Sequence, residues 1–433
     1  MMICSRVRNL SRMLPLLGLL FRADPVLAAE TWYYKSLLVG ERASGMGGAY
    51  SAIADDPSGA WYNPAGLVMG RESYLSGSVN AYQTSSIEFE NVLSGSSYVY
   101  RSQGLIPSFF GFTQELAPKT KFGFLLMVRD SLSQEQDDLL ANLETEESNL
   151  TSITRQLLRN RTSYVVGPAL SQQLSPRLMI GLSAFMLYQS ERFLDQQRAL
   201  YINDVDPLKR DYQLNMTYLT REAWGVMPKL GVLYIPYPRL SVGLTVGKSF
   251  HMAGTGSAKV MGTQVDGDSI VVPTGDFSTD FSAADYSSIR SRVLSPYEAS
   301  LGLAWFPSEV WTLSAQLDGQ TADPEFQYDV VPTWNAAVGA EWAGIPQMPL
   351  RLGFFTNNSN TRGLSSSGTD QREHVNQLGA SGGLSWLSPG SSISVSTTYQ
   401  WGLGSGQIIS GITDVQDVSV SSLTFFLSGS YQL

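Results

Sequence analysis

Hydrophobic and polar residues alternate along most of the chain after residue 72. The stretch 300–318, SLGLAWFPSEVWTLSAQLD, is typical: Leu301, Leu303 and Trp305 fall on one face, and Trp311 and Leu313 resume that face after a turn. Successive side chains of a β-strand point to opposite faces of its sheet. Each arm of this stretch is therefore predicted to be a strand with one apolar face.

The same strand–turn–strand unit recurs six times around a short turn that contains proline. These turns lie at 117–119, 175–177, 236–238, 307–309, 345–347 and 388–390. Proline presets the φ angle of a tight turn and lacks the N–H that a central strand needs, so it marks the hairpin ends. Two further strands, at about 73–83 and 420–433, bring the total to about 14. The polar stretches between the units are predicted to be long loops, at about 84–106, 130–162, 190–222, 251–295, 321–332, 358–375 and 403–419.

An even number of strands, with short turns on one rim and long loops on the other, is typical of bacterial outer-membrane barrels. The prediction is an all-β fold: a transmembrane antiparallel β-barrel of about 14 strands over residues 73–433, in the outer membrane of a Gram-negative bacterium. The alternative is a soluble β-sandwich, whose strands also alternate. Aromatic residues at strand ends favour the barrel, because they match its interfacial girdles: Trp305, Trp311, Trp342, Trp386, Tyr399 and Trp401.

One predicted loop has a helical pattern. Within about 130–162, Leu139, Leu143, Leu150, Ile153 and Leu157 recur at spacings of three, four and seven residues. The pattern predicts a helix that either covers the barrel mouth as a lid or packs on its rim.

Residues 1–28 read as a signal peptide. Arg6, Arg8 and Arg12 precede the apolar run 13–21, and Val26-Leu27-Ala28 offers small residues at a cleavage site. The run is shorter than the roughly 20 residues that a membrane-spanning helix needs. Because Cys4 leaves with this segment, the mature chain has no cysteine, hence no disulfide and no thiolate metal site.

Removing residues 1–28 takes away four of the 29 basic and one of the 38 acidic residues, so 25 − 37 leaves a net charge of −12. This acidic balance argues against a nucleic-acid partner. Nothing in the sequence indicates a cofactor or a metal.

The segment between the signal peptide and the first strand, residues 29–72, is predicted to be a hatch of short helical turns in the barrel lumen. A barrel of this size has a lumen that holds a plug or a water channel. Gly45, Gly47 and Gly48 allow close backbone contact, and Asn63 with Pro64 is suited to a capped turn.

The hatch motifs carry a family resemblance. The runs Gly45-Met46-Gly47-Gly48-Ala49, Ala54-Asp55-Asp56 and Asn63-Pro64-Ala65-Gly66-Leu67 resemble the hatch of the FadL-type transporters of long-chain fatty acids and other hydrophobic compounds. The blocks Pro296-Tyr297-Glu298 and Leu350-Arg351-Leu352-Gly353 are similar to recurring blocks of the same family.

The resemblance implies passive uptake of a hydrophobic small molecule, such as a long-chain fatty acid. The molecule would leave sideways into the membrane through a gap where a strand kinks inward, beside the Asn-Pro-Ala turn. Carried onto this sequence, Asn63, Pro64 and Ala65 would lie against the third strand, about 120–129, and Gly123 is the candidate for its kink. The resemblance also implies a monomer that contacts outer-membrane lipid, or detergent once extracted.

Apolar residues at inward positions of the predicted strands form the candidate ligand path: Phe109, Leu125, Met127, Met179, Phe185 and Leu187. A water-filled porin would carry polar residues there. The same side chains could equally be buried by packing against the hatch.

The sequence does not predict an enzyme. His251 and His374 are the only histidines, and neither stands in a recognisable Ser-His arrangement. Asp55 and Asp56 are expected to cap backbone donors or face water. Two other functions stay open: a scaffold or partner in protein export, and a small-solute porin.

Overall fold

The computed structural model describes residues 33–34, 37–70, 73–93, 96–141, 150–203, 208–266, 269–283, 295–323, 330–368, 371–407 and 413–432. The predicted signal peptide lies outside these ranges. Within them, no helix is long and apolar enough to cross a membrane.

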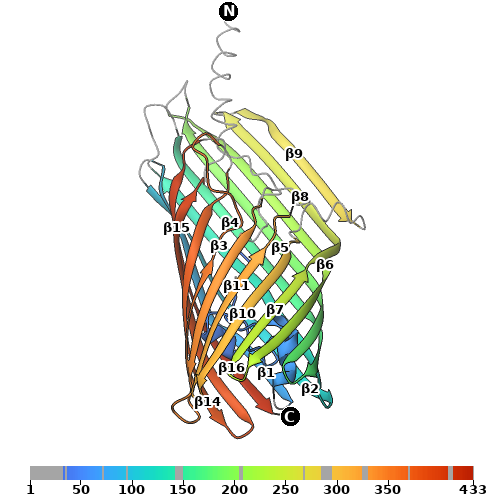
Figure 1. Cartoon of the computed structure of the whole chain (residues 1–433). Helices are drawn as coiled ribbons and strands as arrows, with labels where there is room; N and C mark the ends of the chain where they lie inside the picture. The colour runs from blue at the N-terminus through green and yellow to red at the C-terminus, as the bar shows by residue number, and fades with distance from the viewer. Residues whose placement is uncertain are drawn as a thin grey trace, which may run out of the picture.

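The chain forms a closed antiparallel barrel of fourteen strands (Figure 1). The ring runs from β1 to β7 and then from β10 to β16, and it closes where β1 pairs with β16. The fold class predicted from the alternation is confirmed, and each of the six proline turns joins two neighbouring strands. The ring strands are β1 (Tyr74–Leu93), β2 (Ser96–Ala117), β3 (Thr120–Ala141), β4 (Leu150–Ser175), β5 (Leu178–Ile202), β6 (Arg210–Tyr237), β7 (Leu240–Lys248), β10 (Tyr297–Ser308), β11 (Trp311–Gln320), β12 (Thr333–Trp342), β13 (Leu350–Asn357), β14 (His374–Ser388), β15 (Ser391–Gly406) and β16 (Gln416–Gln432).

A hairpin outside the ring corrects the loop predicted at about 251–295. β8 (Phe250–Asp266) pairs with the upper part of β6 and follows β7 after the single residue Ser249. β9 (Ser269–Ala283) pairs with β8, and the hairpin projects from the loop rim of the barrel (Figure 1).

The helix predicted within about 130–162 is wrong. Residues 130–141 of β3 pair one by one with residues 152–163 of β4, and only 142–149 lie outside the described chain. The spacings from Leu139 to Leu143 and from Ile153 to Leu157 are even, so they also fit the two-residue period of a strand. Pairing with both neighbouring strands overrides the helical spacing in this segment.

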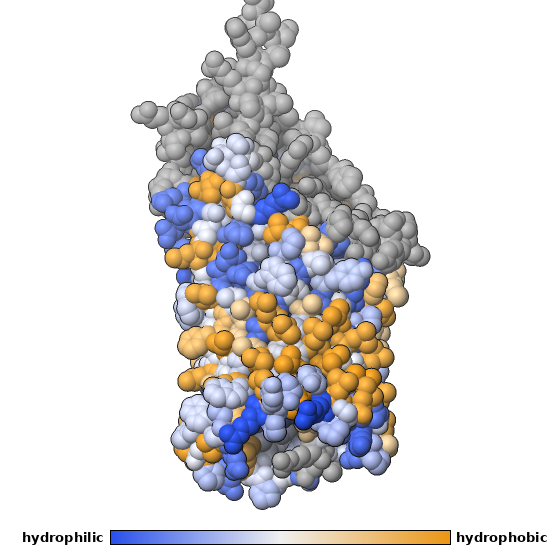
Figure 2. Space-filling model, viewed as in Figure 1, coloured by the Kyte–Doolittle hydropathy of each residue, from blue (hydrophilic) through white to orange (hydrophobic). Residues whose placement is uncertain are grey.

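The outer face of the barrel is apolar where it meets lipid. Figure 2 shows the apolar residues gathered in a belt across the visible face of the barrel, in the half nearer the turn rim. Exposed members of this belt include Leu126, Leu182, Leu230, Leu301, Val338 and Phe354. Such a belt is what a membrane-spanning barrel requires, because lipid faces these side chains.

Aromatic side chains lie at both edges of the belt. On β12, Trp342 lies near the turn rim beside Trp311, with ring centroids 6.4 Å apart, and Trp334 lies at the other end of the strand. The eight residue steps from Trp334 to Trp342 span about 26 Å along a strand. With the usual tilt of about 40°, the belt is about 20 Å high, close to the height of an outer-membrane apolar band.

Placing a charge at the middle of this belt should destabilise the barrel. Val338 lies midway between Trp334 and Trp342 and faces outward. We expect Val338→Arg to lower the free energy of unfolding in lipid vesicles by about 2–4 kcal/mol. Thr154→Arg, also outward but on the part of β4 beyond the belt, is the control and should change it little. Equal losses in guanidinium titrations of both variants would contradict this placement of the membrane.

Candidate channel site: hatch, lumen and wall

The hatch lies inside the barrel, near the turn rim (Figure 1). It consists of α2 (Glu41–Gly45), α3 (Gly59–Tyr62) and the 3-10 helix η1 (Pro64–Met69). Small residues dominate it, so its backbone comes close to the barrel wall. Tyr50, Met46 and Leu67 supply its fully buried larger side chains.

Glycines on both sides let the hatch backbone touch the wall. Gly47 and Gly48 have φ angles of +64° and +76°, which favour glycine. A Cβ atom on Gly353 of β13 would lie 2.2 Å from the Gly47 nitrogen. Ser381 accepts a hydrogen bond from the Gly47 N–H at 2.9 Å and donates one to the Gly45 carbonyl at 2.9 Å. The predicted glycine contacts are therefore present for Gly45 and Gly47.

An ionic network anchors the α2 side of the hatch. The Arg42 guanidinium donates two bonds to Asp55, at 2.7 and 2.9 Å, and two to Glu341 of β12, at 3.1 and 2.8 Å. Burial alone would lower the pKa of Arg42, but Asp55 and Glu341 raise it well above its ordinary value. The Glu41 carboxylate accepts bonds from Ser385, Ser392 and Ser394 of β14 and β15.

The two adjacent aspartates have different partners. Asp56 accepts bonds from the Ser58 N–H at 2.8 Å and the Ser58 hydroxyl at 2.5 Å, so it caps the turn before α3 as predicted. Burial and the neighbouring Asp55 raise the pKa of Asp56. Asp55 instead binds Arg42 and accepts a 2.8 Å bond from the Tyr50 hydroxyl, an ionic role that the sequence did not predict.

Asn63 caps η1 as predicted, because its Oδ1 accepts the Ala65 N–H at 3.1 Å. The predicted neighbour of the Asn-Pro-Ala turn is wrong. Asn63 Nδ2 donates to the carbonyl of Val232 on β6 at 3.0 Å, and a Cβ on Gly181 of β5 would lie 2.3 Å from Pro64. The turn therefore packs on β4, β5 and β6 rather than on the third strand.

The third strand, β3, meets the hatch at Leu67. A Cβ on Gly123 would lie 2.9 Å from Leu67 Cδ1. Gly123 pairs with Thr113 of β2 and with Ala169 of β4, so the strand is regular there and the predicted kink is wrong. The irregularity lies six residues further along, where β3 bulges at Arg129 between Val128 and Asp130.

The ladder between β2 and β3 stops beside this bulge. Phe109 and Met127 form its last pair, and among the described residues no backbone pair links the rest of the two strands. Side chains cross beyond that point: Ser102 donates to the Ser133 carbonyl and Gln136 to the Val99 carbonyl. We call the interval between the Phe109–Met127 pair and the Ser102–Ser133 contact the ladder break.

The predicted ligand-path residues all lie in the lumen, buried to at least nine-tenths. Five of them form one apolar cluster with Val39, Ala60 and Leu67 of the hatch region, against which Trp61 packs: Phe109, Leu125, Met127, Phe185 and Leu187. Met179 lies in a separate cluster with Ala65 and Leu233. Packing against the hatch thus accounts for their burial, and their contact with a ligand stays a prediction.

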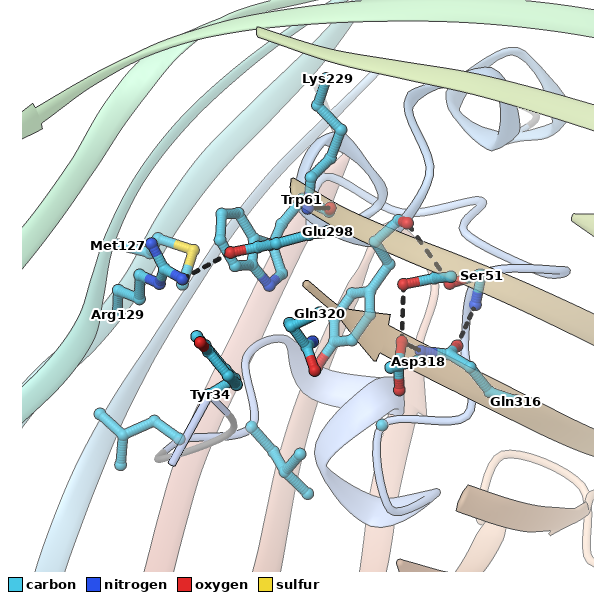
Figure 3. Close-up of a pocket in the computed structure, with 15 residues that line it drawn as sticks. Tyr34, Ser51, Trp61, Met127, Arg129, Lys229, Glu298, Gln316, Asp318 and Gln320 are labelled. Carbon is cyan, nitrogen blue, oxygen red and sulfur yellow. Dashed lines mark hydrogen bonds and ion pairs between the residues drawn. The ribbon is translucent and has the colours of Figure 1, made fainter. Parts of the chain in front are cut away.

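A cavity of about 70 Å³ lies beside this cluster and is mostly polar (Figure 3). Arg129 and Glu298 form an ion pair across it at 2.6 Å, and Lys229 and Trp61 complete that side. Sequence reasoning missed all four residues. Lys229 was detectable, because it is a charged residue at an inward position of the otherwise apolar run 224–237.

The sequence shows no recognisable Ser-His arrangement, but the structure places one histidine beside a serine. His251 Nδ1 lies 2.9 Å from the Ser295 hydroxyl, and the Ser295 N–H donates to Asp323 at 2.6 Å. His251 and Ser295 are buried, so these contacts tie the chain entering β10 to β8.

A methyl group at Gly353 should push the hatch off the wall. Gly353→Ala places a Cβ against the Gly47 nitrogen, and we expect it to cost about 1–3 kcal/mol of hatch docking. Gly382→Ala on the neighbouring β14, where a Cβ meets its nearest atom at 3.7 Å, is the matched control. Hydrogen exchange of residues 45–50 should accelerate only in the first variant. Unchanged protection in Gly353→Ala would show that these glycines do not set the docking.

Comparison with known proteins gives a structural match without a sequence match. No protein-family model matches the chain, and no curated protein matches it.

Solved structures match over nearly the whole chain. A Pseudomonas aeruginosa FadL homologue is 13% identical with a TM-score of 0.60, covering 92% of this chain and 99% of that one. The Pseudomonas putida toluene transporter TodX is 14% identical with a TM-score of 0.60 and the same coverages. The Ralstonia pickettii toluene transporter TbuX is 14% identical with a TM-score of 0.55, again covering 92% and 99%. The chain therefore has the FadL-type fold, a hatch-bearing barrel of the outer-membrane class.

Proposed function

We propose that the protein is an outer-membrane channel for passive uptake of hydrophobic small molecules, which leave its lumen sideways through the ladder break. The observation that carries this proposal is the contact between the break and the apolar cluster. Phe109 and Met127 belong to both: they are the last backbone pair of β2 and β3, and their side chains are buried in the cluster. An apolar molecule in the cluster is thus beside the ladder break.

The height of the break supports an exit into lipid. Val128, next to Met127, pairs with Tyr164 of β4, whose ring stacks on Tyr188 at the loop-side edge of the belt. A molecule passing the break would therefore enter the outer leaflet near its surface.

The burial of apolar surface supplies the driving force. Each buried CH₂ group is worth about 0.8 kcal/mol, so the cluster favours an alkyl chain or an aromatic ring over water. The solved structures of similar fold include proteins described as toluene transporters and a FadL homologue, and this similarity supports the proposal of a hydrophobic substrate. Because one chain closes the ring, we propose that the monomer is the working unit.

A covalent cross-link between β2 and β3 across the ladder break should stop uptake. The mature chain is predicted to lack cysteine, so Ser102→Cys with Ser133→Cys gives one pair, which a short cleavable thiol cross-linker can join across the break. We expect the cross-link to remove most of the protein-dependent uptake of a labelled long-chain fatty acid and of toluene, and reduction to restore it.

The control joins β3 to its paired neighbour. Ser133→Cys with Asn160→Cys links residues that already face each other in the β3–β4 ladder. This cross-link should leave uptake unchanged. If both cross-links act alike, the lateral exit is wrong. If cells with the folded wild-type barrel take up neither compound faster than cells without the protein, the uptake function itself is wrong.

A further inference from the structure

The outer face of the barrel becomes polar on the loop side of the apolar belt. Three aromatic side chains mark this edge on β4, β5 and β6: Tyr164 stacks on Tyr188 with ring centroids 6.2 Å apart, and Tyr188 lies 5.4 Å from Trp224. Beyond the edge β5 and β6 continue as a pair, and β8 pairs with the other side of β6 (Figure 1). The outward side chains of these three strands therefore lie at the level of the outer-leaflet headgroups and above it.

Two exposed cations point outward from this part of the wall, Arg192 of β5 and Lys259 of β8. Arg192 pairs with Thr220 of β6, and Lys259 pairs with Tyr218, the next outward residue of the same strand. The cations thus flank β6, and two strand spacings with two residue steps place their Cα atoms about 12 Å apart. In the part of the chain that the structure describes, neither side chain has a hydrogen bond or an ion pair. Both charges are therefore available to a ligand.

The surface between the two cations suits an anion. The hydroxyls of Thr220 and Ser257 lie 3.2 Å apart there and can donate hydrogen bonds. Among the outward positions of 190–196, 216–222 and 255–261, Glu222 is the one acidic residue. It lies one pair nearer the belt than Thr220, so an anion between Arg192 and Lys259 lies on the side away from it.

The height of the cations matches the phosphate layer of a membrane. Arg192 comes four residues after Tyr188, which is about 13 Å along the strand and about 10 Å along the membrane normal at the usual tilt. Long basic side chains bend back toward the membrane surface. The headgroup layer adds about 5–8 Å to each side of the hydrocarbon core, so both cations can reach its phosphates.

Aromatic side chains continue above the cations, where lipid tails do not reach. Tyr218 and Tyr212 face outward on β6 and are partly exposed, and the Arg198 guanidinium carbon lies 5.0 Å from the ring of Tyr212. An aromatic ring presents a large apolar face with a polar tip, which suits the C–H faces and hydroxyls of sugars. A lipid that carries phosphates and then sugars outward would match this order of side chains.

We propose that the outward face of β5, β6 and β8 binds lipopolysaccharide, the phosphorylated glycolipid of the outer leaflet. Arg192 and Lys259 bind the phosphates at the two ends of its disaccharide headgroup, and Tyr218 and Tyr212 pack on the sugars that follow. Hydrogen bonds between a cationic side chain and a phosphate are charge-assisted, and clusters of basic residues at a membrane surface recognise anionic headgroups. A phospholipid has one phosphate and no sugar chain, so it matches less of this surface. The proposal does not depend on the uptake function.

The test titrates the full-length barrel in detergent with fluorescent lipopolysaccharide. Arg192→Gln with Lys259→Gln should weaken binding at least tenfold, the scale of losing one charge-assisted bond. The control is Lys119→Gln with Arg177→Gln, which removes the same two charges from exposed residues at the turn rim. It should keep the wild-type affinity. All four positions are exposed, so both variants should fold, and heat-modifiable gel migration checks this.

Three further titrations separate phosphate, sugar and charge. Lipopolysaccharide stripped of its phosphates should bind wild type as weakly as the intact lipid binds the Arg192 and Lys259 variant. Tyr218→Ala should weaken binding of lipopolysaccharide and leave binding of phosphatidylglycerol unchanged. Glu222→Gln should strengthen binding, because it removes the nearby negative charge.

Two results would overturn the proposal. Unchanged affinity in the Arg192 and Lys259 variant, or an equal loss in the turn-rim control, would show that these two cations form no site. Phosphatidylglycerol binding as tightly as lipopolysaccharide would show that the surface does not recognise the glycolipid.

Discussion

Lipid offers no hydrogen-bond partner, so every backbone N–H and C=O group within the apolar belt has to be paired inside the protein. The ring of fourteen strands meets this requirement because its first strand, β1, pairs with its last strand, β16. The same constraint explains the position of the ladder break. It begins at Val128, level with Tyr164 at the edge of the belt, where water and headgroups become available. Beyond it, the side chains of Ser102 and Gln136 bind carbonyls that the missing ladder leaves open.

The closed ring creates a lumen, and the hatch fills it by backbone contact more than by side-chain volume. Gly353 and Gly181 remove side chains from the wall at the points where hatch backbone approaches. Serines on the inward face, Ser171, Ser183 and Ser381, then bind hatch carbonyls that burial would otherwise leave unpaired. A wall of this kind fits the backbone of its own hatch. This fit explains why so many inward positions carry small or polar residues.

The sequence predicted those features that depend on local chemistry. Alternation and proline turns identified the six hairpins, and the cap formed by Asn63 followed from residue type alone. Features that depend on pairing between distant segments were predicted wrongly. The leucine spacing within 130–162 fits a strand as well as a helix, and only the register with β4 decides between them. Likewise, no local signal shows that Asn63 lies against Val232, or that β3 bulges at Arg129 rather than bending at Gly123.

The bonds that hold the hatch to the barrel wall differ between its two sides. This difference bears on how a molecule would pass through a barrel whose lumen holds a hatch. On the α2 side the bonds to the wall carry charge: Arg42 binds Glu341 of β12, and Glu41 accepts three serine hydroxyls. On the α3 and η1 side, most bonds are between neutral groups, such as those of Ser171 and Ser183 to backbone carbonyls. Charge-assisted bonds are about twice as strong as neutral ones. The weakly held side is the one that packs on the apolar cluster beside the ladder break. For the proposed uptake, a shift of the hatch at α3 alone would let a molecule reach the ladder break, while the bonds to β12, β14 and β15 keep the hatch in the lumen.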